Sequence, residues 1–213
     1  MIKRMVARVA VLGVGAFALL GLGAMSSVLS RGDTLVGPQL AAAEEPAIDS
    51  TAAFAAMQGQ LKATQSELTR AHQILDYSGR YGIPADLAAD IYDNAVAEGI
   101  PAAVGFQLVK IESNFKNTAA SYASAIGLTQ LRLPTARAYD SSLNMSDLQN
   151  PDVNLQIGFR YLKDLLKRFD NNVALALEAY NKGPTLVAAQ QELGAQIEGK
   201  YSRAVLTGVR KRS

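Results

Sequence analysis

From about residue 77 onward, apolar positions recur at the helical spacing of three to four residues, and no stretch alternates in the manner of a strand. Pro84, Pro101, Pro151 and Pro184 each precede such a run, as proline does in the first turn of a helix. The pattern predicts helices over 85–98, 101–114, 151–169, 172–180 and 184–193. This part of the chain is therefore expected to be a mostly α domain built of short helices.

An earlier segment, residues 54–75, carries a different pattern. Its seam residues recur at alternating spacings of three and four and are Phe54, Met57, Leu61, Thr64, Leu68, Ala71 and Leu75. This heptad-like stripe predicts an amphipathic helix. Two interpretations stay open, namely a coiled coil with a partner and a helix that packs on the domain that follows it.

The N-terminal segment is apolar and uncharged over residues 9–30, behind Lys3, Arg4 and Arg8. Its length is enough for one membrane-spanning helix, and the basic start predicts that the rest of the chain is exported. The segment is either a cleaved signal peptide or an uncleaved membrane anchor, and its length favours the anchor. We therefore expect a signal or anchor over 1–33, a linker with an amphipathic helix over 34–76, and a folded domain over 77–213.

Composition narrows the chemistry. Without the four basic residues and the one aspartate of the first 33 positions, the 21 basic and 19 acidic residues of the chain fall to 17 and 18, so nucleic-acid binding is not expected. The chain has no cysteine, which excludes disulfides and thiol catalysis. Its one histidine, His72, has no companion to build a metal site, and we expect neither a metal nor a cofactor.

Glu112 lies inside an apolar helical stretch. A helix from Pro101 puts it on one side with Gly105, Leu108, Val109 and Phe115, and predicts that Gln107, Lys110 and Asn114 face away. Burial of a carboxyl raises its pKa, as a general acid near neutral pH requires. The alternative is a half-exposed glutamate at a helix end, paired with Lys116.

Four ordered blocks decide between these alternatives: "ESNF", "SYASAIGLTQ", "PDVNLQIGFRYL" and "ALEAYNKGP". From about residue 80 to 206 the chain resembles the soluble-type (SLT) lytic transglycosylases of the lysozyme-like superfamily. Such enzymes cleave the β-1,4 bond between N-acetylmuramic acid and N-acetylglucosamine in peptidoglycan. The resemblance implies that Glu112 is the single catalytic acid and base. It implies substrate contacts from Ser113, Gln130, Tyr180, Asn181 and Tyr201.

The resemblance also implies a mechanism with one carboxyl group. Standard glycosidases need two, whereas in this family the substrate's own 6-hydroxyl attacks and gives a 1,6-anhydro product. No Asp or Glu lies between Glu112 and Asp140, and Glu178 is expected to be structural or solvated rather than catalytic. Two alternatives stay open: a hydrolytic lysozyme of the same superfamily, and a non-catalytic peptidoglycan-binding module. The implied location is the bacterial periplasm, and the implied substrate is peptidoglycan. Residues 9–30 would contact the inner membrane if they are not cleaved. Residues 54–75 are a candidate binding segment for a partner in an envelope assembly.

The chain departs from the family pattern at Ser124, at Pro134 and at Thr129, which replaces a methionine expected to press on the sugar. Tyr122 and Tyr139 are either sugar-stacking platforms or ordinary core or surface residues. Gly127 and Gly183 are expected at turns with positive φ.

Overall fold

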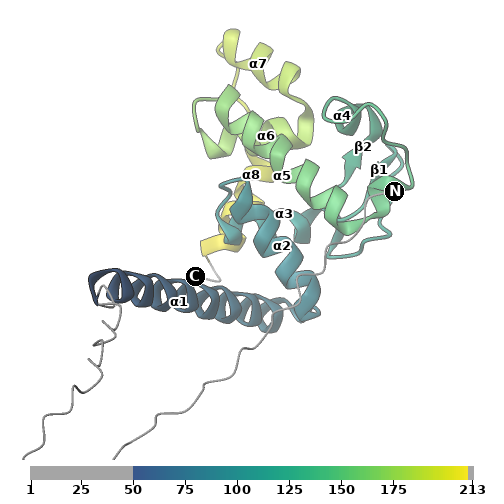
Figure 1. The fold of residues 1–213 in the computed structure, drawn as a ribbon. Coiled ribbons are helices and arrows are strands. Elements are labelled where there is room, and N and C mark those ends of the chain that lie inside the picture. Colours follow the sequence, from purple (N-terminus) through teal and green to yellow (C-terminus); the bar gives the residue numbers. More distant parts are fainter. Residues whose placement is uncertain (1–49, 211–213) are drawn as a thin grey trace, which may run out of the picture. The chain divides into compact units, whose positions relative to one another are not determined.

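The computed structural model describes residues 50–210, which are mostly helical (Figure 1). By its internal contacts the chain divides into two units, residues 1–47 and 48–213, and every described residue belongs to the second. The mostly α expectation is confirmed for this part of the chain. The predicted signal or anchor segment lies outside the described residues. No helix between residues 50 and 210 combines the length and the apolar character needed to cross a membrane.

The elements follow one another in the order α1 (Ser50–Tyr81), α2 (Ala85–Ala97), α3 (Ala102–Ser113), β1 (Ala125–Ile126), β2 (Leu131–Arg132), α4 (Leu133–Arg137), the 3-10 helix η1 (Asp147–Gln149), α5 (Pro151–Arg168), α6 (Val173–Lys182), α7 (Pro184–Glu192) and α8 (Lys200–Arg210). The five helices predicted after residue 84 are confirmed to within two residues at each end. Four of them, α2, α3, α5 and α7, start where proline fixes φ at the N-terminal boundary. The fifth, α6, is capped by the Asn172 side chain, which accepts from the Leu175 amide.

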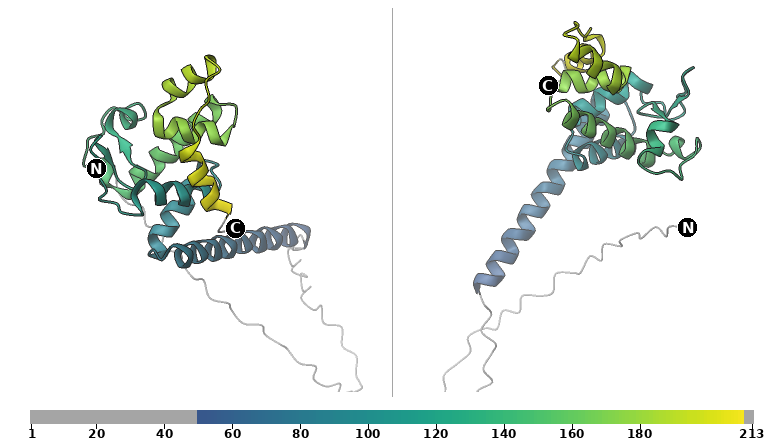
Figure 2. Two further views of the ribbon diagram at one scale, coloured as in Figure 1. Left: turned by 180° about the vertical axis from the view of Figure 1, so that it is seen from behind. Right: turned by 90° about the horizontal axis from the view of Figure 1, so that it is seen from above.

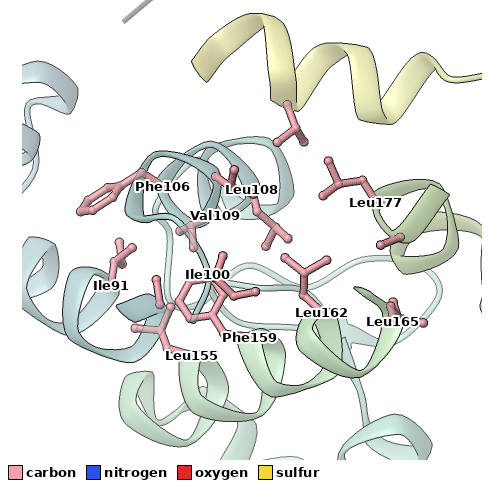
Figure 3. Close-up of a cluster of buried hydrophobic side chains, with 14 of the residues drawn as sticks. Ile91, Ile100, Phe106, Leu108, Val109, Leu155, Phe159, Leu162, Leu165 and Leu177 are labelled. Atoms are coloured by element: carbon pink, nitrogen blue, oxygen red, sulfur yellow. The ribbon is translucent and has the colours of Figure 1, made fainter. Parts of the chain in front are cut away.

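The main core surrounds α3, which packs against α2 and α8, while α5 packs against α2 and α6. Figure 3 shows Leu108 and Val109 of α3 close to Phe159 and Leu162 of α5. These four side chains are at most 1% exposed. Close packing of this kind fixes the position of α3, and with it the position of Glu112 at its end.

A second, smaller core lies under the β-hairpin. Strands β1 and β2 pair antiparallel, with Ala125 opposite Arg132 and Ile126 opposite Leu131. Its buried members are Ile126, Leu131, Ala136, Leu143, Leu148 and Ile157. The sequence did not predict this hairpin, because each strand has only two residues and is too short for any alternation to be visible.

Helix α3 is buried on more sides than its sequence predicts. Gln107, which was expected to face away, is 3% exposed, and its Nε2 donates a hydrogen bond to Tyr81 Oη at 2.8 Å. The prediction was wrong because α8 covers this side of α3. Gly208 of α8 approaches so closely that an added Cβ would lie 2.2 Å from Gln107 Oε1.

The last turns of α1 belong to the main core. The Tyr77 ring stacks on Phe106 with centroids 4.1 Å apart, and the Tyr81 ring stacks on Phe106 at 5.5 Å. Ile74 is also buried in this core. The helix therefore continues through residue 77, where the sequence places the start of the folded domain.

The earlier part of α1 extends away from these helices (Figures 1 and 2). The five large apolar seam residues, Phe54, Met57, Leu61, Leu68 and Leu75, are 56–62% exposed. Helix α1 does pack on the following domain, against α2, as one of the two interpretations of residues 54–75 predicts, but this contact lies beside the seam and leaves the seam residues exposed.

Phe106→Ala should lower the free energy of unfolding by about 3–5 kcal/mol, because it removes a fully buried ring that contacts two tyrosines. Urea denaturation followed by circular dichroism measures this change. Tyr122→Ala is the control, since Tyr122 is fully exposed and its loss should change the value by no more than about 0.5 kcal/mol. Equal effects of the two substitutions would contradict the assignment of the core.

Candidate active site

Glu112 lies in the last turn of α3, and the chain leaves the helix directly after Ser113. Asn114 and Phe115 both have positive φ values, 49° and 63°. The Asn114 amide still donates to the Lys110 carbonyl, which closes the helix end. Asparagine tolerates this left-handed conformation, whereas a bulky residue such as phenylalanine rarely adopts it. The abrupt end leaves the Glu112 side chain at the rim of the helical core.

The Glu112 side chain lines a cavity of about 470 Å³. One wall comes from the loop before β1, from the hairpin and from α4, and the other from α5, α6 and the start of α7. The remaining lining residues are Ser121, Ala123, Ala125, Gln130, Leu131, Arg132, Thr135, Tyr161, Tyr180, Asn181, Lys182, Gly183 and Pro184. Glu112 is thus the one carboxyl group among the described residues that line this cavity.

Burial raises the pKa of Glu112 above its ordinary value of 4.5. A hydrogen bond from Tyr201 Oη to Glu112 Oε1 acts in the opposite direction, and the net direction is upward. Burial also raises the pKa of Tyr201, as does the neighbouring carboxylate, so the phenol stays a donor. The raised pKa agrees with the first sequence alternative, whereas the intermediate exposure and the position at the helix end agree with the second. The hydrogen-bond partner of Glu112 is Tyr201 rather than Lys116.

Tyr180 and Asn181 approach the cavity from the end of α6. Tyr180 Oη donates to the Thr129 carbonyl at 2.9 Å, which joins the two walls. The ring of Tyr161, on α5, lies 5.2 Å from that of Tyr180 at 45°. Burial raises the pKa of Tyr180 well above its ordinary value, and the nearby Glu112 raises it further. The site therefore holds Tyr161, Tyr180 and Tyr201 around one carboxyl group.

Gln130 lines the cavity but uses its amide to hold the chain. Its Nε2 donates to the carbonyls of Ala119 and Gly127, each at 3.1 Å. Gly127 has φ +80°, and an added Cβ would lie 2.3 Å from Asn154 Nδ2. Gly183 has φ +93°, so both glycines predicted at positive φ are confirmed.

Asn154 is the residue on which this loop depends, and the sequence analysis did not select it. Its side chain is completely buried. Oδ1 accepts from the amide of Thr129 at 2.8 Å and from the Thr129 hydroxyl at 2.7 Å. Nδ2 donates to the carbonyls of Ile126 and Leu148, both at 2.9 Å. One amide of α5 therefore satisfies four polar groups of the hairpin and of η1.

Thr129 does not face the cavity, which corrects the expectation that it replaces a residue pressing on the sugar. It is completely buried between Asn154 and Gly158, where an added Cβ on the glycine would lie 2.3 Å from the threonine hydroxyl. A threonine fits here because its hydroxyl finds a partner in the buried amide.

Three other residues considered from the sequence lie away from the cavity lining. Ser113 is buried, and its hydroxyl donates to the Val109 carbonyl of its own helix at 3.0 Å. Tyr122 is fully exposed. Tyr139 donates to Asp164 Oδ2 at 2.9 Å and packs against the smaller core.

Glu178 also lies away from the cavity and has a structural environment. Its Oε1 accepts from the Ser202 amide at 2.8 Å, and its Oε2 pairs with Lys182 at 2.9 Å. Burial would raise the pKa of Glu178, but these contacts lower it overall. The charged form is therefore held in place between α6 and α8, as the structural interpretation predicts.

The cavity also contains residues that sequence analysis missed, chiefly Tyr161, Arg132 and Thr135. Tyr161 lies one turn after Gly158 in a block already selected, so its spacing was the available signal. Arg132 follows Gln130 by two residues and has no comparable pattern. Within residues 50–210, no group of acidic or histidine side chains is arranged to hold a metal ion.

Comparison with known families supports this description. The family model for the transglycosylase SLT domain matches the sequence over residues 91–201, from α2 to the start of α8. This match covers just over half of the 213 residues. The chain belongs to the transglycosylase SLT domain family. Glu112, Gln130, Tyr180, Asn181 and Tyr201 all lie inside the matched range.

Two solved structures have a similar fold. An inactive mutant of the lytic transglycosylase Slt from Pseudomonas aeruginosa matches with a TM-score of 0.53 and 26% identity over 58% of this chain. The 70 kDa soluble lytic transglycosylase SLT70 from Escherichia coli matches with a TM-score of 0.53 and 22% identity over 64% of this chain. The matches cover 23% and 25% of those longer proteins. What this chain shares with them is thus the SLT fold, over about a quarter of their length.

Glu112→Gln should stabilise the folded protein at neutral pH. Because the folded-state pKa of Glu112 is raised, the unfolded chain loses this proton first as the pH rises through 4.5, and stability falls until the folded-state pKa is passed. The amide carries no charge, so the gain should shrink as the pH falls below 4.5. Urea titrations between about pH 4 and pH 7 measure the difference in the free energy of unfolding between the variant and the unchanged protein, with Glu192→Gln at an exposed position as control. A less stable Glu112→Gln protein at neutral pH would contradict the raised pKa.

Asn154→Asp should destabilise the protein by about 3–5 kcal/mol, because it places an unpaired buried carboxylate against the carbonyls of Ile126 and Leu148. The matched control is Asn150→Asp. Asn150 caps α5 by accepting from the Asp152 amide, and aspartate caps a helix equally well, so the change should stay within about 0.5 kcal/mol. Similar effects in a thermal unfolding experiment would refute the role assigned to the Asn154 amide.

Proposed function

We propose that this protein is a peptidoglycan lytic transglycosylase that cleaves the β-1,4 bond between N-acetylmuramic acid and N-acetylglucosamine and leaves 1,6-anhydro-muramoyl ends. The observation that carries the proposal is the half-buried Glu112 at the wall of a cavity with no second carboxyl group among its described lining residues. Membership of the SLT family supports the reaction class. The two structural neighbours bear the name lytic transglycosylase.

In the first step Glu112 acts as a general acid. Its raised pKa favours the protonated form, and the proton passes to the glycosidic oxygen as the bond to C1 of the muramoyl unit breaks. Tyr201 occupies Oε1, which leaves Oε2 as the oxygen that carries the proton. The positive charge that develops at C1 is stabilised by the acetamide group of the same sugar.

In the second step Glu112 acts as a base. The 6-hydroxyl of the muramoyl unit attacks C1, its proton returns to the Glu112 carboxylate, and the acid is restored. The nucleophile is already tethered to the reacting sugar, so no side chain has to position a water molecule. This agrees with a cavity in which one carboxyl serves both steps, whereas a hydrolase with two carboxyl groups would place them about 5–10 Å apart.

The surrounding side chains are assigned to binding. Tyr161 and Tyr180 present aromatic surface, which suits the apolar faces of sugar rings, and Asn181 offers an amide for sugar hydroxyl or acetamide groups. Gln130 holds the wall through its Nε2, so its contribution to binding is through loop position. Ser113 supports the end of α3.

The substrate implies an exported protein. We propose a periplasmic location, with residues 9–30 acting as an inner-membrane anchor or being removed with a signal peptide. The basic residues before this segment and its lack of charge support export.

Incubation of purified sacculi with the full chain should release muropeptides with anhydro ends, identified by mass spectrometry. Glu112→Gln should lower the rate by about 10²–10⁴-fold, because the amide cannot transfer a proton. The control Glu192→Gln, on the exposed end of α7, should keep the original rate.

Two other outcomes would refute the proposal in different ways. Products with reducing ends that disappear in Glu112→Gln would indicate a hydrolase. Retained binding to sacculi with no product from the unchanged protein would indicate a binding module.

A further inference from the structure

The exposed side of α1 has a regular composition that the proposed function does not use. We call its seven residues the α1 seam: Phe54, Leu61, Leu68 and Leu75 at position a of a heptad, and Met57, Thr64 and Ala71 at position d. The alternation of three and four is unbroken over these residues, which lie on one continuous helix. A helix at 1.5 Å per residue makes this seam about 33 Å long.

The catalytic domain packs on a different side of α1. Arg70 forms an ion pair with Asp93 of α2, and Ser66 and Thr69 face the same helix across a shallow hollow. Arg70, Ser66 and Thr69 occupy positions c, f and b, which face away from positions a and d. The contact that holds α1 to the domain therefore leaves the seam open, as the exposure of its large residues shows.

A repeat of seven residues fits another helix rather than a flat surface or a groove. Its average spacing of 3.5 keeps the apolar residues on one line only when two helices wrap around each other. We propose that two copies of this chain pair in parallel and in register through the α1 seam.

The side chains that flank the seam favour a second copy in this orientation, because Glu67 can accept a hydrogen bond from a histidine of the partner helix. Positions e are Gln58, Gln65 and His72, and the exposed positions g are Gln60 and Glu67. Ile74, also at position g, is buried in the main core of its own domain. In a parallel pair, g of one helix faces the following e of its partner, so Glu67 of one copy lies opposite His72 of the other. In an antiparallel pair, g faces g and e faces e, and these two side chains do not meet. No like charges face each other across the parallel seam.

The d positions also suit close approach. Thr64 and Ala71 are small, so two helices can come near each other around the larger a residues. The pairing would bring two catalytic domains to the same end of the paired helices, where both can act on one polymeric substrate. Pairing itself does not depend on what the cavity binds, so its test is independent of catalysis.

The absence of cysteine makes the test direct, because one introduced thiol is the only one in the chain. Ala71→Cys at position d should form a disulfide between two copies when the full chain, in mild detergent, is oxidised and run on a non-reducing gel. The matched control is Gln73→Cys, two residues away at position f, where the side chain is also exposed but faces away from the seam. We expect about tenfold more cross-linked dimer from Ala71→Cys, since only position d brings the two sulfur atoms within bonding distance.

A second substitution tests whether the seam causes the cross-link. Leu68→Glu puts a charge into the seam three residues before the thiol and should remove most of the Ala71→Cys dimer, while turnover per domain is kept. Three results would overturn the proposal: no dimer from Ala71→Cys, equal dimer from Gln73→Cys, or a dimer that survives Leu68→Glu. The first of these is also the result expected if another protein, or an antiparallel copy, covers the seam.

Discussion

The buried amide of Asn154 joins the main core of the SLT domain to the smaller core under the hairpin. On one side it belongs to α5, which is fixed in the main core by Leu155 and Phe159. On the other side it satisfies the Thr129 amide and two carbonyls of the chain around the β-hairpin. The hairpin has only two residues in each strand, too few to be stable by itself. The wall of the cavity opposite α6 therefore depends on hydrogen bonds from α5 rather than on its own ladder.

The position and the protonation of Glu112 also depend on a few contacts. Glu112 is placed by helix geometry, since it sits in the last turn of a helix that is buried on nearly every side. Its protonation is then set by two opposed effects, burial and the hydrogen bond from Tyr201. The effect of burial is the larger one, so the pKa of Glu112 is raised toward the range in which a carboxyl group can both give and take a proton. A carboxyl group more exposed to water would be ionised, and one without a polar partner would be harder to return to its charged form.

Helix α1 combines two environments along one continuous element. Its last turns are part of the main core through Tyr77 and Tyr81, whereas its first six turns are exposed. Because the helix is continuous, any partner that binds its exposed part also orients the domain that packs on its buried part. Exposure of the apolar seam to water is unfavourable in free energy, so a partner that covers the seam would stabilise this part of α1.

The sequence by itself determined five of the helices after residue 84, because their apolar spacing and the prolines before four of them are local signals, but it predicted neither α4 nor α8. Its four family-like blocks also singled out Glu112 as the candidate acid, and it placed Gly127 and Gly183 at turns. Tertiary structure decided the rest. Tyr201 meets Glu112 across 89 residues of chain, Thr129 turns away from the cavity toward Asn154, and Gln107 is covered by α8. Each of these depends on which distant segment packs against the residue, and helical periodicity specifies a buried side without specifying its neighbour.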